Sequence, residues 1–346
     1  MNHIINEDLQ YLFLNSKLDW DRFRNKTVLV SGTYGMLPSY MVFMLIYLNE
    51  NNVPVNIIAL GRNREKAREC FGHYMDKHYF TFLEMDVCDP LNVDCKIDFI
   101  VHAASPASSQ YYSVNPVGVL KPNVLGTYNL LELAKKHQCE SFLYFSSGEI
   151  YGKMESEQIV ETDSGYLNPM DIRSCYAESK RLGETMCISY HHQFDIPVKV
   201  IRCAHIYGPT MDLKNDSRVF SQFVSNIVSS QNIEMKSDGE AIRSFCYISD
   251  ANDAFFRILL NGVSGEAYNI ANPAGRISIK DLALLLVSLY PEKKLTVTIQ
   301  KQNENYVENT HKRHPQFNVD KLRSLGWSPQ FDIEEGFKRT IKSFII

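Results

Sequence analysis

The sequence lacks the features of a membrane-spanning, secreted or nucleic-acid-binding protein. Its apolar runs are all shorter than the roughly 20 residues that a helix needs to cross a bilayer. Its first residues, MNHIINED, lack the basic and apolar regions of a secretory signal. A net charge of −4 leaves no excess of positive charge to attract nucleic acid or an anionic membrane. We therefore expect no nucleic-acid partner and no membrane association.

The sequence also lacks cysteine pairs with CxxC spacing, although it contains eight cysteines, several of them inside apolar runs. This distribution is typical of reduced, buried thiols, because disulfides persist mainly in oxidising compartments. No cluster of His, Cys, Asp and Glu has the spacing of metal ligands. We therefore expect a cytoplasmic protein without a metal site.

What the sequence does contain is a regular alternation of short apolar segments and longer helical ones. The strands expected from the apolar segments are residues 26–31, 55–60, 81–85, 97–102, 141–147 and 198–203. The helices expected between them reach from the first strand to about residue 49 and then cover residues 64–77, 116–137 and 174–193. Alternation of this kind predicts an α/β protein with a doubly wound parallel sheet of the Rossmann type.

An amphipathic segment precedes this predicted sheet. Residues 5–24 carry Leu9, Leu12, Phe13 and Trp20 on a helical period. We expect a helical extension over residues 1–25 that packs on the domain or on a second subunit.

After about residue 205 the pattern becomes irregular. We expect short strands there and helices within residues 216–230, 250–261 and 278–290. Residues 26–205 are therefore predicted to form the dinucleotide-binding domain, and residues 206–346 mainly a smaller substrate-binding domain. This smaller domain should lie at the carboxyl edge of the sheet, where ligands of such sheets bind.

A glycine-containing turn, GTYGMLP, lies between the first strand and the first helix. Gly32 would make the tight turn, and Gly35 would let a pyrophosphate approach the N–H groups at the helix start, flanked by Tyr34 and Met36. Pro38 stands at the place of the usual third glycine, which a first helical turn tolerates. The turn predicts a dinucleotide site.

Two later segments support a dinucleotide site. Asp86 and Val87 follow the third strand, where a carboxylate could accept a hydrogen bond from the amino group of adenine. Ala103 and Ala104 follow the fourth strand, where small side chains would let the cofactor lie across the sheet.

The end of the second strand has no acidic residue. A site for NAD normally places Asp or Glu there to bind the ribose 2′-hydroxyl, whereas sites for NADP use Arg. Gly61 and Arg62 stand there instead. We expect NAD or NADP as the cofactor, with Arg62 favouring NADP; the alternative is that Arg62 is a solvated charge at a helix start.

Tyr176 and Lys180 are four residues apart on a predicted helix and therefore share one face. A neighbouring ammonium is expected to lower the pKa of the phenol, which is about 10 when unperturbed. Ser147, at the end of the fifth predicted strand, could orient a substrate alcohol or ketone for proton exchange with Tyr176.

These segments, with several others, resemble the extended short-chain dehydrogenase/reductase family that remodels nucleotide-linked sugars. The resemblance is greatest to UDP-glucuronate decarboxylases (UDP-xylose synthases), followed by sugar-nucleotide 4,6-dehydratases. It spans about residues 26–340. The segments that carry it are residues 102–108 (HAASPAS), Tyr112 with Asn115-Pro116, 123–129 (NVLGTYN), 146–152 (SSGEIYG), 173–180 (RSCYAESK), 207–209 (YGP), 217–219 (SRV), 242–247 (IRSFCY) with Asp250, and 268–272 (YNIAN).

The resemblance implies a catalytic role for four residues. Ser147, Tyr176 and Lys180 are similar to the triad that moves the C4-hydroxyl proton of the sugar while NAD(P) accepts the hydride. Glu149 is similar to the glutamate that serves as a base near C5.

The resemblance also implies the contacts of a nucleotide-linked sugar. Tyr112 and Ser105 are similar to residues of the sugar pocket, and Arg218 and Arg243 to contacts of the nucleotide diphosphate, which suits guanidinium chemistry. For Arg218, a plain surface charge remains the alternative.

Two substrate-side positions depart from the family pattern. Gly148 stands where glucose-type dehydratases carry an acidic residue and the decarboxylases a serine. His205 stands where the family usually places an asparagine that contacts the sugar diphosphate. A histidine there could donate to phosphate, or it could be a structural residue at a strand end.

The reaction is left open between four possibilities that share oxidation or reduction at C4. Decarboxylation or dehydration of the sugar is favoured, with an NADPH-dependent 4-ketoreductase or a 4-epimerase as alternatives. Gly148 weakens the dehydratase, because loss of the C6 hydroxyl benefits from a positioned acid that glycine cannot supply. The alternative that is not an enzyme is a relative of this family that keeps the fold and binds its ligands without turnover.

The resemblance implies a homodimer as well. The helix over residues 174–193 bears Leu182, Met186, Ile188 and Tyr190. Together with the helix over residues 116–137 it would form a two-fold, four-helix contact, although ordinary intramolecular burial would also suit these side chains.

Overall fold

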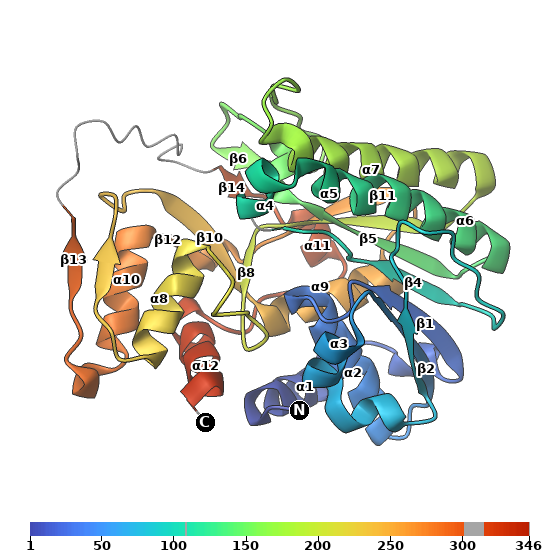
Figure 1. Cartoon of the computed structure of the whole chain (residues 1–346), viewed down its shortest axis with the longest axis horizontal. Helices are drawn as coiled ribbons and strands as arrows, with labels where there is room; N and C mark the ends of the chain where they lie inside the picture. The colour runs from blue at the N-terminus through green and yellow to red at the C-terminus, as the bar shows by residue number, and fades with distance from the viewer. Residues whose placement is uncertain (108, 301–314, 346) are drawn as a thin grey trace.

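A seven-stranded parallel sheet forms the centre of the protein (Figure 1). The structure, a computed structural model, describes residues 1–107, 109–300 and 315–345. In spatial order the strands are β11 (Glu266–Ile270), β7 (Val198–Cys203), β5 (Ser141–Ser147), β4 (Phe99–His102), β1 (Lys26–Ser31), β2 (Val55–Gly61) and β3 (Phe80–Glu84). The predicted doubly wound parallel sheet is confirmed, and β11 adds a strand that the sequence pattern did not reveal.

The strands are apolar throughout because both faces of the sheet are covered. Val28 and Val30 of β1 face one hydrophobic core, and Leu29 between them faces a second core on the opposite side. The first core is closed by α2 (Met36–Glu50), α3 (Arg64–Phe71) and α9 (Ile248–Asn261). The second is closed by α6 (Thr127–His137) and α7 (Ser174–Phe194).

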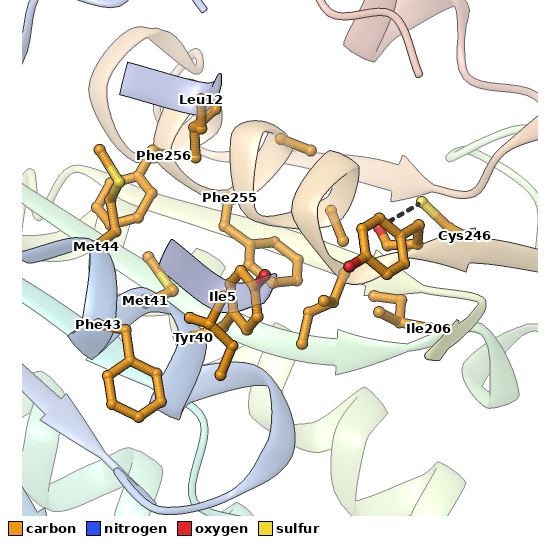
Figure 2. Packing of buried hydrophobic residues seen from close by; sticks show 14 of the residues in the cluster. Ile5, Leu12, Tyr40, Met41, Phe43, Met44, Ile206, Cys246, Phe255 and Phe256 are labelled. Carbon is orange, nitrogen blue, oxygen red and sulfur yellow. Dashed lines mark hydrogen bonds between the residues drawn. The ribbon is translucent and has the colours of Figure 1, made fainter. Parts of the chain in front are cut away.

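The N-terminal extension packs on the first core, as one of the two sequence-based alternatives predicted. Figure 2 shows Ile5 of this extension near Tyr40 of α2 and Phe255 of α9, and Leu12 near Phe256 of α9. Its helix α1 (His3–Asn15) is shorter than the predicted residues 5–24. Lys17 adopts a left-handed φ of 57°, which stops the helix, and a short 3-10 turn, η1 (Trp20–Phe23), follows.

Asp8 of α1 is fully buried and holds the extension in place. Its Oδ2 accepts hydrogen bonds from Tyr40 and from Tyr247, and Arg339 lies 2.7 Å from its Oδ1. These partners belong to α2, to the start of α9 and to the C-terminal helix α12 (Ile333–Ile345). The extension therefore joins both parts of the molecule.

The predicted helix over residues 116–137 is not uniform. It consists of α5 (Pro116–Lys121), a π-helical turn η3 (Pro122–Gly126) and α6. Pro122 has no N–H to continue the α-helical pattern, and π-helical turns of this kind accompany functional sites in many proteins. The predicted helix over 64–77 likewise ends at Phe71, because Gly72 takes a φ of 52° and begins η2 (Gly72–Asp76).

The smaller part of the molecule lies beside the sheet (left in Figure 1). Its three-stranded sheet has the order β12-β10-β8, and two strand pairs, β13–β9 and β14–β6, accompany it. The strands are β6 (Gln158–Ile159), β8 (His205–Tyr207), β9 (Ile233–Met235), β10 (Ile242–Tyr247), β12 (Arg276–Ser278), β13 (Val297–Ile299) and β14 (Gln316–Phe317). The remaining helices and helical turns of the whole protein are α4 (Ser109–Val114), η4 (Gly148–Tyr151), α8 (Val219–Val228), η5 (Pro273–Gly275), α10 (Ile279–Ser288), η6 (Pro291–Lys293) and α11 (Asp320–Ser324).

The polypeptide crosses between the two parts more than once. After β8 and β10, helix α9 and strand β11 return to the seven-stranded sheet. The division of the chain into two domains at residue 205 therefore stays a prediction. Residues 301–314 and 346 of the predicted second domain lie outside the residues that the structure describes. Among the residues that the structure describes, no helix combines the length and the apolar character needed to span a membrane.

Candidate functional site

The ends of β1 and β4 are joined by a buried hydrogen-bond network. Ser31 and His102 are neighbours in the sheet, with 2.9 Å between Ser31 Oγ and His102 Nδ1. His102 Nε2 lies 3.0 Å from Thr127 Oγ1, which itself donates to the carbonyl of Asn123. Since Thr127 uses its proton there, His102 donates from Nε2 and accepts from Ser31 at Nδ1.

Burial keeps this histidine neutral. Desolvation, helped by the nearby charge of Lys180, lowers the pKa of His102 to about 3. Ser31 Oγ in turn accepts from the N–H groups of Ala103 and Ala104, at 3.2 and 3.3 Å. The network therefore holds the two small residues in place at the carboxyl end of β4, where the sequence predicted them to face a cofactor.

The glycine turn approaches this same strand end. Gly32 has a φ of 69°, and a Cβ added to it would lie 2.7 Å from Cα of Ala104. Only glycine fits both the backbone conformation and this close approach. Gly35 is the N-cap of α2, and Pro38 lies in the first helical turn, as predicted.

This turn has the properties of an anion site. Within the described residues no side chain caps the N-terminus of α2, which begins at Met36. The hydroxyl of Thr33 is fully buried and has no partner in the described part of the chain. Free N–H groups and the positive end of the helix dipole favour a phosphate. The residues present therefore fit the pyrophosphate of a dinucleotide.

The end of β2 carries the ring of Tyr34. A Cβ added to Gly61 would lie 2.7 Å from Tyr34 Cε1, so glycine is required for this ring to lie there. Arg62 is largely exposed, and its Nη1 lies 3.4 Å from Asp86 Oδ2. Burial opposes ionisation of Asp86, but the N–H of Cys88 and the charge of Arg62 outweigh it and lower the pKa of the carboxyl.

Val87, the other residue predicted to contact adenine, is buried under the π-helical turn. A Cβ added to Gly126 would lie 2.8 Å from Val87 Cγ1. Asn129 donates to the carbonyl of Val87 at 3.0 Å. The structure thus brings together the ends of β1, β2, β3 and β4, where the predicted cofactor residues stand.

The predicted triad lies beside this group. Ser147 is the last residue of β5, and its hydroxyl lies close enough to the phenol of Tyr176 on α7 to influence its ionisation. Lys180 is buried one turn further along α7 and donates from Nζ to the carbonyl of Phe145 at 2.6 Å. Its Nζ lies 5.9 Å from the ring centroid of Tyr176. The three side chains are adjacent, as the spacing in the sequence predicted.

The predicted lowering of the Tyr176 pKa is wrong for the folded chain. Burial raises the pKa of Tyr176 well above its ordinary value, although the hydrogen bond from Ser147 opposes the shift. Burial also lowers the pKa of Lys180 to about 7, despite opposing contributions from Cys203 and Glu184. Desolvation disfavours both charged forms and outweighs their mutual attraction. Sequence spacing carries no information on this burial.

The ring of Tyr112 lies against one face of the ring of Tyr176. The two rings are stacked, and Tyr112 donates from its hydroxyl to the carbonyl of Ala107 at 3.2 Å. The hydroxyl of Ser105, nearby in sequence, is buried without a partner among the described residues. Two of the predicted sugar contacts therefore lie on the segment that follows β4.

Glu149 follows Ser147 and Gly148 in the turn η4. Glu149 is exposed as a residue, although the protein around its carboxyl group desolvates that group. This desolvation raises the pKa of Glu149, and the charges of Arg173 and Arg243 oppose the shift. Sequence reasoning missed Arg173, although it opens the segment that carries Tyr176.

Gly148 faces an aromatic ring that sequence reasoning also missed. A Cβ added to Gly148 would lie 2.5 Å from Phe317 Cζ. Phe317 belongs to β14, far along the chain, and no local motif marks it.

The predicted diphosphate contacts come from the smaller part of the molecule. Arg218 Nη2 is 2.6 Å from Asp216 Oδ2 and 3.5 Å from Met36 Sδ, so it reaches the start of α2. Arg243 lies on β10, and its charge acts on Glu149. His205 begins β8 and has its ring near those of Phe220 and Phe245.

Comparison with known proteins gives a family and a fold. The NAD dependent epimerase/dehydratase family matches residues 28–271. The chain is 33% identical to UDP-glucuronic acid decarboxylase 3 from Arabidopsis thaliana over 313 residues, which are 90% of this chain and 87% of the relative. It is 31% identical to UDP-glucuronic acid decarboxylase 1 from Xenopus tropicalis over 319 residues, 92% of this chain and 72% of the relative.

A solved structure has the same fold. UDP-glucose 4-epimerase from Thermotoga maritima, with UDP-glucose, superposes with a TM-score of 0.76 at 22% identity. The match covers 92% of this chain and 98% of the epimerase.

Proposed function

Because the chain belongs to the NAD dependent epimerase/dehydratase family, we propose that it decarboxylates a nucleotide-linked uronic acid, with UDP-glucuronate as its substrate. The family match confirms the resemblance predicted from the sequence motifs, and with it an enzyme of the extended short-chain dehydrogenase/reductase type. One observation carries the proposal: Ser147 and Tyr176 are neighbours and lie beside Glu149, next to a residue 148 that has no side chain.

In the first step the chain's own residues handle the proton of the sugar's C4 hydroxyl. Bound NAD would supply the acceptor for the C4 hydride. Tyr176 receives the hydroxyl proton, and Ser147 holds the substrate oxygen through its own hydroxyl. Tyr176 must be a phenolate to receive this proton, and it becomes a neutral phenol when it does. Lys180, buried with a pKa of about 7, can hold a proton near neutral pH, and its charge then stabilises that phenolate.

In the second step the C4 ketone receives electrons. The C5–C6 bond breaks, carbon dioxide leaves, and the electron pair moves into the ketone as an enolate. A proton then returns to C5, and the C4 ketone regains a hydride from the reduced cofactor and a proton from Tyr176, so that the net change is the loss of carbon dioxide. Because desolvation raises the pKa of Glu149, this carboxyl group holds a proton more readily than an ordinary glutamate and could deliver the proton to C5. Dehydration would need a second acid for the C6 hydroxyl, which Gly148 cannot supply.

The substrate would be held mainly by side chains of the smaller part. Arg218 and Arg243 would bind the diphosphate, since guanidinium groups pair well with phosphate oxygens. His205 would lie beside the sugar diphosphate, and Tyr112 and Ser105 would contact the sugar. The unpartnered hydroxyl of Ser105 supports such a contact.

For the cofactor, we propose that the protein accepts NADP as well as NAD and favours NADP. The exposed guanidinium of Arg62 could bind a 2′-phosphate, whereas no carboxylate stands at the end of β2 to bind a 2′-hydroxyl. The contact between Arg62 and Asp86, at 3.4 Å, is long enough to be exchanged for a phosphate.

We further propose a homodimer, formed by the outer faces of α5, α6 and α7, which lie side by side in Figure 1. Met186 and Tyr190, two of the predicted contact residues, pack instead on the protein's own second core. Leu182 and Ile188 are exposed and support the proposal. Further exposed apolar side chains lie on α4, α5, η3 and α6, namely Val114, Val117, Leu120, Leu125 and Tyr128.

All eight cysteines are free thiols, which agrees with the reduced state predicted from the sequence. A cytoplasmic location is part of the proposal and follows from the reduced thiols.

Product analysis tests the proposed reaction. The purified protein is incubated with NAD or NADP and, separately, with UDP-glucuronate, UDP-glucose, dTDP-glucose and GDP- or CDP-sugars. We expect UDP-glucuronate to lose carbon dioxide. Loss of water, gain of two hydrogens or an unchanged mass would indicate a dehydratase, a reductase or an epimerase and would contradict the proposal.

A further inference from the structure

The ring of Phe317 occupies the space into which a side chain at position 148 would extend. A Cβ at Gly148 would lie 2.5 Å from Cζ and 3.0 Å from Cε1 of this ring, and 3.4 Å from the carbonyl oxygen of Cys203. Contacts under 3.0 Å between such atoms essentially do not occur. Gly148 and Phe317 are therefore matched to each other: the ring can lie there only because residue 148 is glycine.

Phe317 is firmly held in this place. It belongs to β14, which pairs with β6 in a register that sets Phe317 opposite Ile159. Asn318, the next residue, donates from its backbone to the carbonyl of Ile159 at 2.8 Å. The ring also meets that of Tyr151 edge-on, with centroids 5.8 Å apart. Two strands and an aromatic neighbour thus fix its position.

Tyr151 is itself fixed from behind by polar contacts. Its hydroxyl donates to Asn269 Oδ1 at 2.6 Å, and Arg202 donates to the same hydroxyl at 3.0 Å. The turn η4, which holds both Gly148 and Glu149, ends at Tyr151. The ring of Phe317 therefore lies against both ends of η4, at Gly148 and at Tyr151.

The ring lies beside the reacting groups rather than behind them. Gly148 stands between Ser147, which neighbours Tyr176, and Glu149. Phe317 is only half-buried, so part of its surface remains available to a ligand. An apolar, non-ionisable side chain therefore stands where a polar side chain on residue 148 would otherwise face the substrate.

We propose that Phe317 is a specificity-determining residue that forms an apolar wall at the C6 end of the bound sugar and favours loss of a C6 carboxylate. This inference rests on the proposed function. The wall would touch the substrate beside Glu149, and it would keep water and acidic side chains away from C6.

The chemical reason is the change of charge at C6 during decarboxylation. The carboxylate begins with a full negative charge and leaves as neutral carbon dioxide, while the electron pair of the broken C5–C6 bond moves toward the C4 ketone. An apolar wall withholds hydration from the carboxylate and disfavours it relative to the transition state, in which the charge has moved away. A C6 hydroxyl gains nothing from such a wall, because its departure as water needs a proton from an acid.

The test uses two substitutions of nearly equal shape at Phe317. Leu keeps the wall apolar, and Asn makes it polar. We compare Phe317→Leu with Phe317→Asn in the full-length protein, measuring kcat and KM for carbon dioxide release from UDP-glucuronate and the melting temperature of each variant. Phe13→Asn, at a half-buried aromatic of α1 remote from the site, is the matched control for loss of a ring.

We expect Phe317→Leu to keep kcat within about threefold of the unmodified protein with KM nearly unchanged. Phe317→Asn should lower kcat by about tenfold or more and lower KM as well, because the carboxylate of the bound substrate is no longer disfavoured. Phe13→Asn should lower the melting temperature without a selective loss of kcat. Equal kcat values for the Leu and Asn variants would overturn the role of the apolar wall.

A second comparison tests the steric match by activity, with the melting temperatures of the same variants as a second measurement. Gly148→Ala is expected to lower kcat/KM by about tenfold in the natural background, but by less than about twofold in the Phe317→Leu background, which lacks the colliding ring atoms. Equal losses in the two backgrounds would overturn the match between the two residues.

These outcomes are separate from a failure of the proposed function. Carbon dioxide release by the unmodified protein tests the function alone. If the unmodified protein releases none, the decarboxylase and the wall at C6 are both wrong, while the melting temperatures of the Gly148→Ala variants still decide the steric match. If it does release carbon dioxide, equal rates for the Leu and Asn variants contradict only the role of Phe317.

Discussion

The ring of Tyr112 lies flat against the ring of Tyr176, with centroids 5.0 Å apart and an angle of 11° between the planes. Both rings are buried, and Tyr112 is tied by its hydroxyl to the segment after β4. Tyr176 is thus held by a ring on one side and has Ser147 near its hydroxyl. Its orientation is therefore set by three separate segments of the chain.

Replacing Tyr176 by Phe removes the proposed proton acceptor and keeps the stacked ring. We expect turnover to fall by about 100-fold or more, because general acid–base groups contribute about that much or more. The melting temperature and the affinity for UDP-glucuronate should change little. Steady-state kinetics and a binding titration measure these quantities, and near-normal turnover would contradict the acid–base role.

Replacing Tyr112 separates the stack from the hydrogen bond. Tyr112→Ala removes the ring that orients Tyr176, and we expect kcat to fall by about tenfold or more. Tyr112→Phe keeps the ring and removes only the bond to Ala107, so its loss of kcat should be clearly smaller. Comparable losses in both variants would mean that the hydroxyl, rather than the stack, is what matters.

Arg62 is predicted to bind the 2′-phosphate of NADP. We expect Arg62→Ala to weaken NADP binding by about tenfold or more, because charge-assisted hydrogen bonds are lost, and to leave NAD binding almost unchanged. Titration of each cofactor against both proteins measures this. A natural protein that binds NAD much more tightly than NADP would refute the proposed preference.

Leu182 is predicted to lie in a homodimer contact. Its side chain is 45% exposed on α7, and Glu at this position would place a charge in an apolar contact. We expect Leu182→Glu to sediment as a monomer at micromolar concentration, whereas the natural protein sediments as a dimer. Leu284→Glu, on α10 with 48% exposure, is the matched control and should remain dimeric. A natural protein that is monomeric would contradict the proposal.

Asp250 should make stability depend on pH. Burial raises the pKa of its carboxyl to about 7, although it accepts hydrogen bonds from the N–H groups of Gln330 and Phe331. In the unfolded chain the pKa is near the ordinary 3.8, so between about pH 4 and pH 7 the folded state binds more protons than the unfolded state. The contribution of Asp250 is therefore full below pH 4 and is lost as the pH rises through 7.

We expect the contribution of Asp250 to the free energy of unfolding to fall by a few kcal/mol between about pH 4 and pH 7. Urea unfolding at several pH values measures it. The difference between the natural protein and Asp250→Asn isolates this residue from Asp8 and Asp253, which act on it. Asp94→Asn, an exposed position, is the control, and an equal slope in Asp250→Asn and the natural protein would contradict the assignment.

Much of the fold could be predicted because its signals are local. The apolar runs of β1 and β5 and the helical period of α7 are read from neighbouring residues, and the glycine turn needs only Gly32 and Gly35 at a set spacing. The helix breaks at Lys17 and Gly72 were missed, because either residue can continue or end a helix and the surrounding packing decides. Strand β11 was missed since it is short and follows an irregular segment.

The sequence by itself determined which chemistry-bearing residues stand together. Tyr176 and Lys180 share a helix face because of the helical period, and Ser147 and Gly32 end strands that a parallel sheet places at one edge. Tertiary structure alone decided how those residues are tuned. Burial reversed the expected pKa shift of Tyr176 and brought Lys180 to about 7. Phe317 reached Gly148 from a distant strand, because desolvation and close packing depend on segments that only folding brings together.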